Sequence, residues 1–200
     1  MNSAMTVGGL VVGLAGVLLT IFYARKAERL NSIRKRLDWS DLQAAASDLS
    51  QKIRADFTPT AVVTPGLTGA TFANLLVTDL PNQPPVYVGI RTWKEAAHSA
   101  GYTSDSFRIE TKKWIVEIPA SVSALIESQG DILIVDDFAM SGDFLEMLRT
   151  ELVAAGFQKE QIHSCSLAVT KVAIKNHKAP DYYWWIADDD DFYFPWGKAR

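Results

Sequence analysis

The chain has 200 residues, of which 48% are hydrophobic and 22% are charged, a composition typical of globular proteins. With 12 Gly, 8 Pro and a single cysteine, it excludes the disordered, collagenous and disulfide-stabilised classes. The charge is divided unevenly. Residues 1–36 carry six basic side chains against Glu28, a net charge of +5, whereas the other 164 residues carry 14 basic and 22 acidic side chains, about −8. The larger part therefore lacks the basic surface of a nucleic-acid-binding domain, and we expect no nucleic-acid partner.

The first predicted element is a membrane-spanning helix over residues 4–23, which hold 20 residues without a charge. A helix of that length, rising about 1.5 Å per residue, reaches about 30 Å, the thickness of the hydrocarbon core of a bilayer. A cleavable signal peptide would have basic residues before a shorter apolar run, whereas here the basic residues follow it. The segment is therefore predicted to be an anchor; the alternative is an apolar helix that packs on its own domain.

The basic residues that follow the predicted span place the large domain in the cytoplasm and residues 1–3 outside the cytoplasm. Residues 24–37 are predicted to form a basic juxtamembrane helix against anionic lipid, or else a solvated connector. Gly9 and Gly13 form a GxxxG pair through which two anchors could form a homodimer, although glycine is common in membrane helices. We therefore expect a single-pass membrane protein with one large domain over residues 38–200.

Helices and strands alternate along that domain. Ser40 and Gln43 predict a capping box for a helix that runs to about Arg54. Continuously or alternately apolar runs predict strands at residues 60–64, 86–91, 113–118, 132–135, 162–171 and 181–186, and a helix is predicted over residues 142–155, with Gly156 as its C-cap. This alternation predicts an α/β fold with an open, mainly parallel sheet, flanking helices and a ligand crevice at the carboxyl ends of the strands.

The strongest local signal is ILIVDDFAMSGDFLEML at residues 132–148, an apolar strand followed by two carboxylates, a short turn and a helix. Backbone N–H groups at the start of a helix, together with the hydroxyl of Ser141, suit a phosphate group. Asp136 and Asp137 suit the hydroxyls of a sugar or the ligand shell of a magnesium ion. The alternative interpretation is an ordinary strand-to-helix turn with an aspartate cap.

This segment resembles the phosphoribosyl pyrophosphate signature of type I phosphoribosyltransferases. Three other segments resemble parts of that family in the same order. TPGLTGATFANLL at residues 64–76 is similar to the pyrophosphate loop, the polar residues 92–112 to the lid that closes over substrate, and DFYFPWG at residues 191–197 to the C-terminal hood. The resemblance covers residues 40–200.

The resemblance implies transfer of ribose 5-phosphate from phosphoribosyl pyrophosphate to a purine or related base, with Mg²⁺ as cofactor and with release of pyrophosphate. It assigns Asp136 and Asp137 to the ribose hydroxyls; the substrate mainly holds Mg²⁺, and these two carboxylates are its candidate protein ligands. The other implied contacts are Leu67, Thr68 and Gly69 with pyrophosphate, Met140, Ser141, Gly142 and Asp143 with the 5′-phosphate, and Lys171, Phe192 and Tyr193 with the base.

Four residues depart from the family's pattern. Met140 stands where purine enzymes often have an acid, Phe144 replaces the threonine that closes the phosphate loop, Asp143 adds a negative charge to that loop, and Thr68 replaces a frequent basic residue. The first three departures favour a second hypothesis, a catalytically weak or inactive module that binds a nucleotide or phosphoribosyl pyrophosphate as a sensor or membrane effector, whereas the Asp136 and Asp137 pair, Lys171 and the hood favour the transferase. A third hypothesis is a sugar-phosphate or nucleoside hydrolase built on the same crevice.

Overall fold

The computed structural model describes residues 17, 19, 20, 23, 35–96, 106–111 and 113–199. The predicted span therefore lies largely, and its GxxxG pair wholly, outside the described residues; so do residues 24–34 of the predicted juxtamembrane helix. Among the residues that are described, no helix is both long enough and apolar enough to cross a bilayer.

The centre of the domain is a five-stranded sheet in the order β3-β2-β7-β8-β9, in which every neighbouring pair is parallel. Its strands are β2 (Ala61–Thr64), β3 (Val86–Val88), β7 (Ile132–Ala139), β8 (Ile162–Thr170) and β9 (Tyr182–Ala187). The predicted α/β class with a mainly parallel sheet is confirmed. The pairing of β2 with β7 brings the ends of the two motif-bearing strands side by side.

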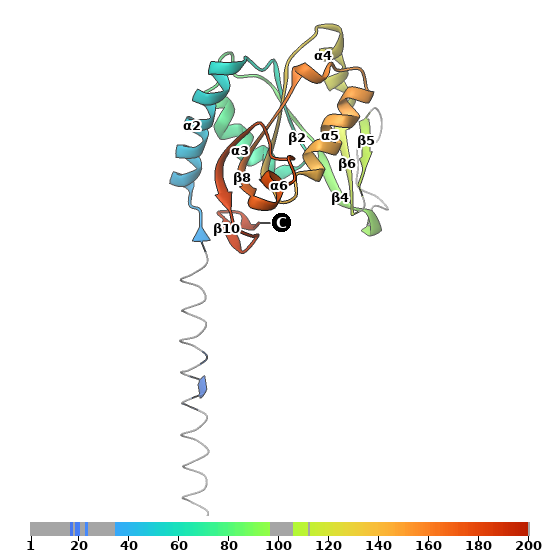
Figure 1. Cartoon of the computed structure of the whole chain (residues 1–200). Helices are drawn as coiled ribbons and strands as arrows, with labels where there is room; N and C mark the ends of the chain where they lie inside the picture. The colour runs from blue at the N-terminus through green and yellow to red at the C-terminus, as the bar shows by residue number, and fades with distance from the viewer. Residues whose placement is uncertain are drawn as a thin grey trace, which may run out of the picture.

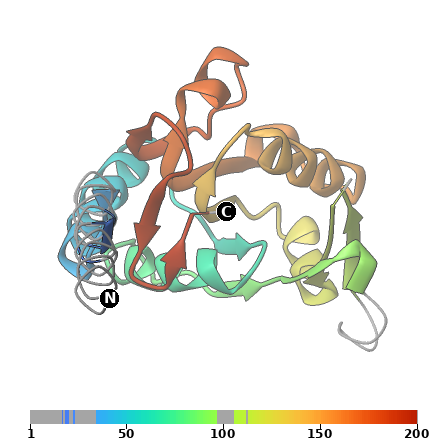
Figure 2. The ribbon, with the colours of Figure 1, turned by 90° about the horizontal axis from the view of Figure 1, so that it is seen from below.

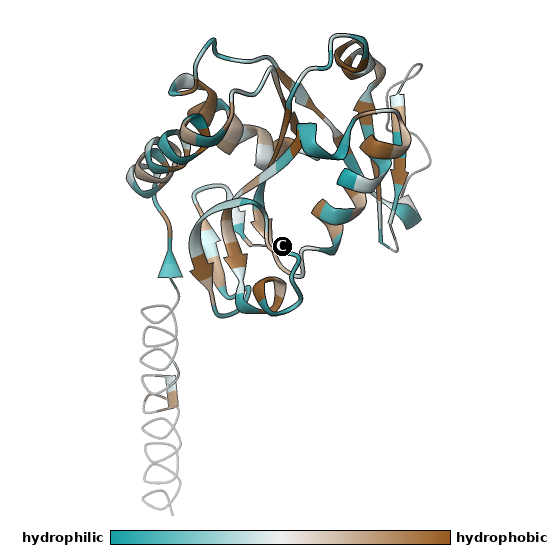
Figure 3. Ribbon diagram, turned by 45° about the horizontal axis from the view of Figure 1, so that its top comes forward, coloured by the Kyte–Doolittle hydropathy of each residue, from teal (hydrophilic) through white to brown (hydrophobic). Residues whose placement is uncertain are grey.

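Helices cover both faces of this sheet (Figures 1 and 2). The helix α2 (Trp39–Asp56) lies beside α3 (Leu67–Thr78) on one face, and α5 (Asp143–Ala154) lies on the other. Leu133 and Val135 of β7 join the core under α2 and α3, whereas Ile132 and Ile134 join the core under α5. Because both faces are covered, residues 132–135 of β7 are apolar without alternation, and Figure 3 shows hydrophobic residues on the central strands as well as on parts of the helices.

A second, antiparallel sheet in the order β4-β6-β5 adjoins the central one. It consists of β4 (Ile90–Trp93), β5 (Ser106–Glu110) and β6 (Trp114–Pro119). The single strand predicted at residues 86–91 is thus two strands that divide at Gly89. The amide of Gly89 donates to the carbonyl oxygen of Thr64 at 2.7 Å, and a Cβ at Gly89 would lie 2.9 Å from that oxygen, so only glycine allows the chain to pass between sheets here.

The predicted lid at residues 92–112 is described in part. It contains the end of β4, the short 3₁₀ helix Lys94–Ala96 and strand β5, while residues 97–105 and 112 lie outside the described residues. Other short helices are α4 (Ala124–Glu127) and the 3₁₀ turns Ala120–Ser123 and Lys159–Gln161.

Several predicted boundaries need correction. The N-cap of α2 is Asp38, whose side chain accepts the amide of Asp41 at 3.0 Å while Asp41 accepts the amide of Asp38; the box predicted at Ser40 is therefore two residues late. The strand predicted to end at Lys171 ends at Thr170, whose hydroxyl oxygen accepts the first amides of α6 (Lys171–Lys175) and so starts a helix. The C-cap of α5 is Ala155, and Gly156 follows it at φ +117°.

The prediction of a helix through residue 37 is wrong at its end, because Lys35 and Arg36 form strand β1. This strand pairs in parallel with β10 (Phe192–Phe194), which in turn pairs antiparallel with β11 (Gly197–Lys198). The C-terminal segment predicted to be a hood is therefore a small sheet of its own. It lies at the end of the domain where the chain enters from residue 34 (Figure 1).

Candidate functional site

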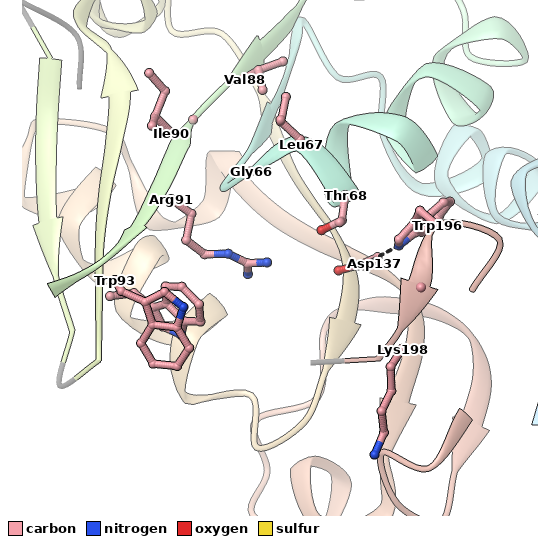
Figure 4. Close-up of a pocket in the computed structure, with 13 residues that line it drawn as sticks. Gly66, Leu67, Thr68, Val88, Ile90, Arg91, Trp93, Asp137, Trp196 and Lys198 are labelled. Carbon is pink, nitrogen blue, oxygen red and sulfur yellow. Dashed lines mark hydrogen bonds between the residues drawn. The ribbon is translucent and has the colours of Figure 1, made fainter. Parts of the chain in front are cut away.

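Two adjoining cavities, of about 830 and 350 Å³, open at the carboxyl ends of β2 and β7. Arg91, Trp93 and Trp114 line both cavities, which therefore form one cleft. The start of α3 and the hood complete the larger cavity (Figure 4), and the turn between β7 and α5 completes the smaller one. The sequence predicted a crevice at this edge of the sheet, and the structure places it there.

Asp136 and Asp137 lie where the two cavities meet. Strand β7 continues through them, and they are only 2% and 7% exposed, respectively. Asp137 lines the larger cavity and accepts a hydrogen bond from Nε1 of Trp196 at 3.1 Å. Asp136 lines the smaller cavity, and its Oδ1 accepts the backbone amide of Asp137 at 3.0 Å. The predicted pair of carboxylates is thus buried at the floor of the cleft.

Burial, together with the negative charge of Asp137, raises the pKa of Asp136 well above its usual value, although the Arg91 guanidinium opposes this. The Nη1 atom of Arg91 lies 3.8 Å from Oδ2 of Asp136. A buried carboxyl whose pKa is strongly shifted at the floor of a cleft is typical of a functional site.

Arg91 is the main site residue that the sequence analysis did not identify. Its guanidinium carbon lies 5.3 Å from the ring centroid of Trp114 and 6.0 Å from that of Phe144, so aromatic rings hold the cation. A Cβ built on Gly66 would lie 3.5 Å from Cβ of Arg91, which places the arginine against the turn before α3. It brings a positive charge to the cavity that Thr68 also lines, and Figure 4 shows it pointing into this cavity.

The start of α3 faces the larger cavity. Its N-cap, Gly66, provides no side-chain hydrogen bond, and the first-turn amides are therefore available to an anion. The hydroxyl oxygen of Thr68 is buried and has no hydrogen-bond partner among the described residues; in Figure 4 it is directed toward Asp137. Leu67 also lines the cavity. Gly69 does not line it: a Cβ there would lie 2.8 Å from the carbonyl oxygen of Val135, so this glycine allows α3 to pack on β7.

Met140, Ser141 and Gly142 line the smaller cavity, in the turn where the 5′-phosphate was predicted. Asp143 follows this turn and pairs with Lys178, and its Oδ2 accepts the hydroxyl of Ser141 at 2.9 Å. Both contacts, the lysine first, lower the pKa of Asp143, so it is a carboxylate at neutral pH. The positive charge of Lys178 therefore balances the negative charge of Asp143. The hydroxyl of Ser141 already donates to Asp143, so this donor is occupied within the turn.

The three residues predicted to contact a base are not among the described residues that line either cavity. Phe192 is 2% exposed and makes edge contacts with Phe138 and Trp185 at centroid distances of 5.1 and 4.7 Å. Its ring has no face for a base, and the predicted stacking is wrong. The carbonyl oxygen of Tyr193 accepts the amide of Leu37 at 2.8 Å, which ties this residue to β1.

Lys171 is a surface residue, because its side chain is 71% exposed and pairs with Asp188. The hood still reaches the cleft, but through different residues: Trp196, Gly197 and Lys198 line the larger cavity. The aromatic-rich end of the chain signalled a hood, but not which of its aromatic residues would face the cleft.

Comparison with known proteins supports the fold. No protein family model and no curated protein matches the chain. Among solved structures it is similar to a purine phosphoribosyltransferase from Pyrococcus horikoshii, with a TM-score of 0.60 and 20% identity over 82% of this chain and 95% of that one. A xanthine-guanine-hypoxanthine phosphoribosyltransferase from Helicobacter pylori has a TM-score of 0.56 and 18% identity, over 82% and 91% of the two chains.

A hypothetical protein from Neisseria gonorrhoeae with bound ppGpp is also similar, with a TM-score of 0.53 and 22% identity over 82% of this chain and 90% of that one. At these identities the similarity shows the fold. The domain has the architecture of purine phosphoribosyltransferases, and its activity has to be argued from the site.

Proposed function

We propose that this protein is a membrane-anchored phosphoribosyltransferase that transfers ribose 5-phosphate from phosphoribosyl pyrophosphate to a purine or related base. The observation that carries the proposal is the juxtaposition of the buried Asp136 and Asp137 with Arg91 and with the open start of α3. The two carboxylates can accept the hydroxyl groups of a sugar, and the neighbouring guanidinium and backbone amides can bind an anion. Together they match a ribose that carries pyrophosphate.

In this proposal the pyrophosphate lies in the larger cavity, against the first-turn amides of α3, the unpartnered hydroxyl of Thr68 and the Arg91 guanidinium. The carboxylates of Asp136 and Asp137 accept the ribose hydroxyls. The 5′-phosphate lies at the start of α5, where Gly142 provides no side-chain cap. The base lies on the hood side of Asp137, near Trp196 and Lys198.

The reaction is a displacement at the anomeric carbon. A ring nitrogen of the base forms a bond to this carbon while the bond to the pyrophosphate oxygen breaks. The electron pair of the broken bond leaves with pyrophosphate, and the proton of the ring nitrogen passes to water. The ribose carries positive charge in the transition state, so the buried carboxylates stabilise it, and Arg91 stabilises the charge that develops on the leaving group. The protein acts mainly by positioning and by electrostatics.

A magnesium ion fits this site. Mg²⁺ prefers oxygen ligands and is usually bound by one or two carboxylates together with substrate phosphates. Asp136 and Asp137 offer such oxygen ligands at the floor of the cleft and would hold the ion together with the substrate phosphates. When bound, it supplies positive charge to the leaving pyrophosphate.

A second candidate function is a module that binds a nucleotide or phosphoribosyl pyrophosphate without turnover. The specific observation in its favour is the turn before α5, where Ser141 donates to Asp143 and Lys178 pairs with the same carboxylate. A phosphate would have to share this turn with a resident negative charge. The similar Neisseria gonorrhoeae protein holds ppGpp, which is consistent with nucleotide binding on this fold.

The membrane anchor rests on the uncharged run at residues 4–23 and on the basic residues that follow it. With this orientation, residues 24–200 lie in the cytoplasm. A Lys175→Cys variant in intact cells tests the orientation, because Lys175 is exposed and the native Cys165 is fully buried. We expect an impermeant thiol reagent to label it only after lysis; labelling of intact cells would reverse the assignment.

Substrate class is tested by incubating the full chain with labelled phosphoribosyl pyrophosphate, Mg²⁺ and a panel of purines and pyrimidines. We expect a labelled nucleoside 5′-monophosphate with at least one purine or related base. Saturable binding of phosphoribosyl pyrophosphate without product from any base would favour the binding module instead.

A further inference from the structure

The indole of Trp196 makes a direct contact with the floor of the cleft. Its Nε1–H group donates to Oδ2 of Asp137 at 3.1 Å, as the dashed line in Figure 4 shows. Asp137 is 7% exposed, so this hydrogen bond is made to a carboxylate that is largely removed from water. Hydrogen bonds to ionised groups are stronger than those between neutral groups. A rigid indole donor therefore fixes the orientation of this carboxylate through one of its two oxygens.

Other aromatic rings hold Trp196 in turn. It stacks on Phe194 with a centroid distance of 5.1 Å and an interplanar angle of 16°, and Trp39 meets it edge-on at 6.1 Å. Trp39 is the first residue of α2, so the contact comes from the N-terminal end of the domain. Trp196 therefore packs between Phe194 of the C-terminal hood and Trp39 at the start of α2, and we call these two contacts the clamp.

The N-terminal strand also fixes the hood itself. Lys35 and Arg36 of β1 pair with Phe192 and Tyr193 of β10. The Lys35 ammonium lies 3.8 Å from the centroid of the Trp185 ring, which adds a cation–π contact to the backbone pairing. This small sheet is separate from the five-stranded sheet that carries the carboxylates. The link from the hood to the site therefore includes the hydrogen bond of Trp196.

We infer that Trp196 is a positioning residue for Asp137, and that residues 35–39 hold Trp196 in place. The inference rests on the proposed function, in which Asp137 accepts a ribose hydroxyl. It follows that residues 35–39, which join residues 1–34 to the domain, contribute to the affinity of the site for the sugar. A displacement of β1 or Trp39 would loosen the indole and, through it, the carboxylate.

The first test is a double-mutant cycle with the full chain, in which calorimetry measures the affinity for Mg²⁺ and phosphoribosyl pyrophosphate without a base. Trp196→Phe keeps an aromatic ring and removes the donor, and we expect it to weaken binding about tenfold, the loss of one charge-assisted hydrogen bond. In the Asp137→Ala background, which leaves no acceptor for the indole, the same substitution should have little further effect, because Trp196 acts through that carboxylate. Trp184→Phe, outside the described cavity linings, is the matched control. Additive losses, or an unchanged affinity in Trp196→Phe, would overturn the inference.

The second test examines the clamp. Trp39 is 52% exposed, so Trp39→Ala leaves the core intact. We expect it to weaken binding of the same ligand about threefold and to shift the indole N–H resonance of Trp196, which the Trp196→Phe variant identifies in the NMR spectrum. An unshifted resonance together with an unchanged affinity would refute the role of residues 35–39.

The indole resonance also separates this inference from the proposed function. If the wild-type chain binds no phosphoribosyl pyrophosphate, the proposed function fails. The Trp196 resonance in the ligand-free chain then decides the positioning contact: a shift caused by both Asp137→Asn and Trp39→Ala supports it, and a resonance that neither substitution moves refutes it.

Discussion

Gly142 offers the sharpest test of the turn proposed to hold the 5′-phosphate. It has φ +76°, and a Cβ added to it would lie 1.8 Å from the carbonyl oxygen of Lys178. Gly142→Ala would therefore impose an unfavourable backbone conformation and a collision with backbone. The left-handed conformation costs about 1–2 kcal/mol for an L-residue. Moving the loop around Lys178 adds about 1–3 kcal/mol, typical of overpacking.

The sum, about 2–5 kcal/mol, is smaller than the about 5–15 kcal/mol by which domains are usually stable, so the fold should survive. At about 2–4 °C per kcal/mol, the expected fall in Tm is about 4–20 °C. Displacement of the turn moves the amides at the start of α5, and we expect affinity for phosphoribosyl pyrophosphate to fall at least about tenfold, or about 1.4 kcal/mol.

Gly156→Ala is the matched control at the other end of α5. Gly156 also has a positive φ, +117°, but a Cβ there would lie 3.5 Å from the Ile126 side chain, an ordinary contact. We expect this variant to lose only the conformational part of the stability and none of the ligand affinity. Thermal unfolding and calorimetry of both variants give the comparison. A loss of affinity in Gly156→Ala, or unchanged affinity in Gly142→Ala, would refute the reasoning.

Three further predictions follow from the cleft. Folding raises the pKa of Asp136, so the native state keeps the proton of this carboxyl to a higher pH than the unfolded state does. The free energy of unfolding therefore falls as the pH rises above the usual pKa of an aspartate. Asp136→Asn should therefore gain stability relative to wild type with rising pH in urea unfolding; a pH-independent difference would contradict this. Arg91→Gln should weaken pyrophosphate binding about tenfold or more in calorimetry, whereas Lys94→Gln, in the 3₁₀ helix that follows β4, should not. Equal effects of the two substitutions would show that Arg91 does not bind the anion. Phe192→Ala should lower the free energy of unfolding by about 3–5 kcal/mol in urea denaturation, as a core residue would; a loss under about 1 kcal/mol would contradict its burial.

The sequence predicted the central sheet well, because continuous apolar runs such as residues 132–135 are typical of strands buried on both faces. It did not predict that the strand continues through Asp136 and Asp137, since buried carboxylates are rare and hydropathy ends the strand before them. Their place at a ligand crevice was nonetheless predicted, because it follows from strand polarity in a parallel sheet.

The remaining errors concern contacts between segments that are distant in sequence. Arg91 reaches the site because the chain changes sheets at Gly89, which depends on a close approach to Thr64 that no local pattern encodes. Phe192 was expected to face a base, but β10 pairs with β1 and the Phe192 side chain points into the core. The sequence predicted a helix where β1 lies. The face that a short strand presents depends on its partner, so Trp196 could not be identified from the sequence as the residue that contacts Asp137.

Release of pyrophosphate tests the central claim most directly. The full chain is incubated with phosphoribosyl pyrophosphate, saturating Mg²⁺ and each common purine and pyrimidine, and compared with the Asp136→Asn/Asp137→Asn variant. If the two carboxylates stabilise the developing charge on the ribose, the wild-type chain releases pyrophosphate with at least one purine or related base, and the variant loses rate beyond any loss of substrate binding. Release no faster than in the variant, with every base, would contradict the assignment as a phosphoribosyltransferase and leave a binding module.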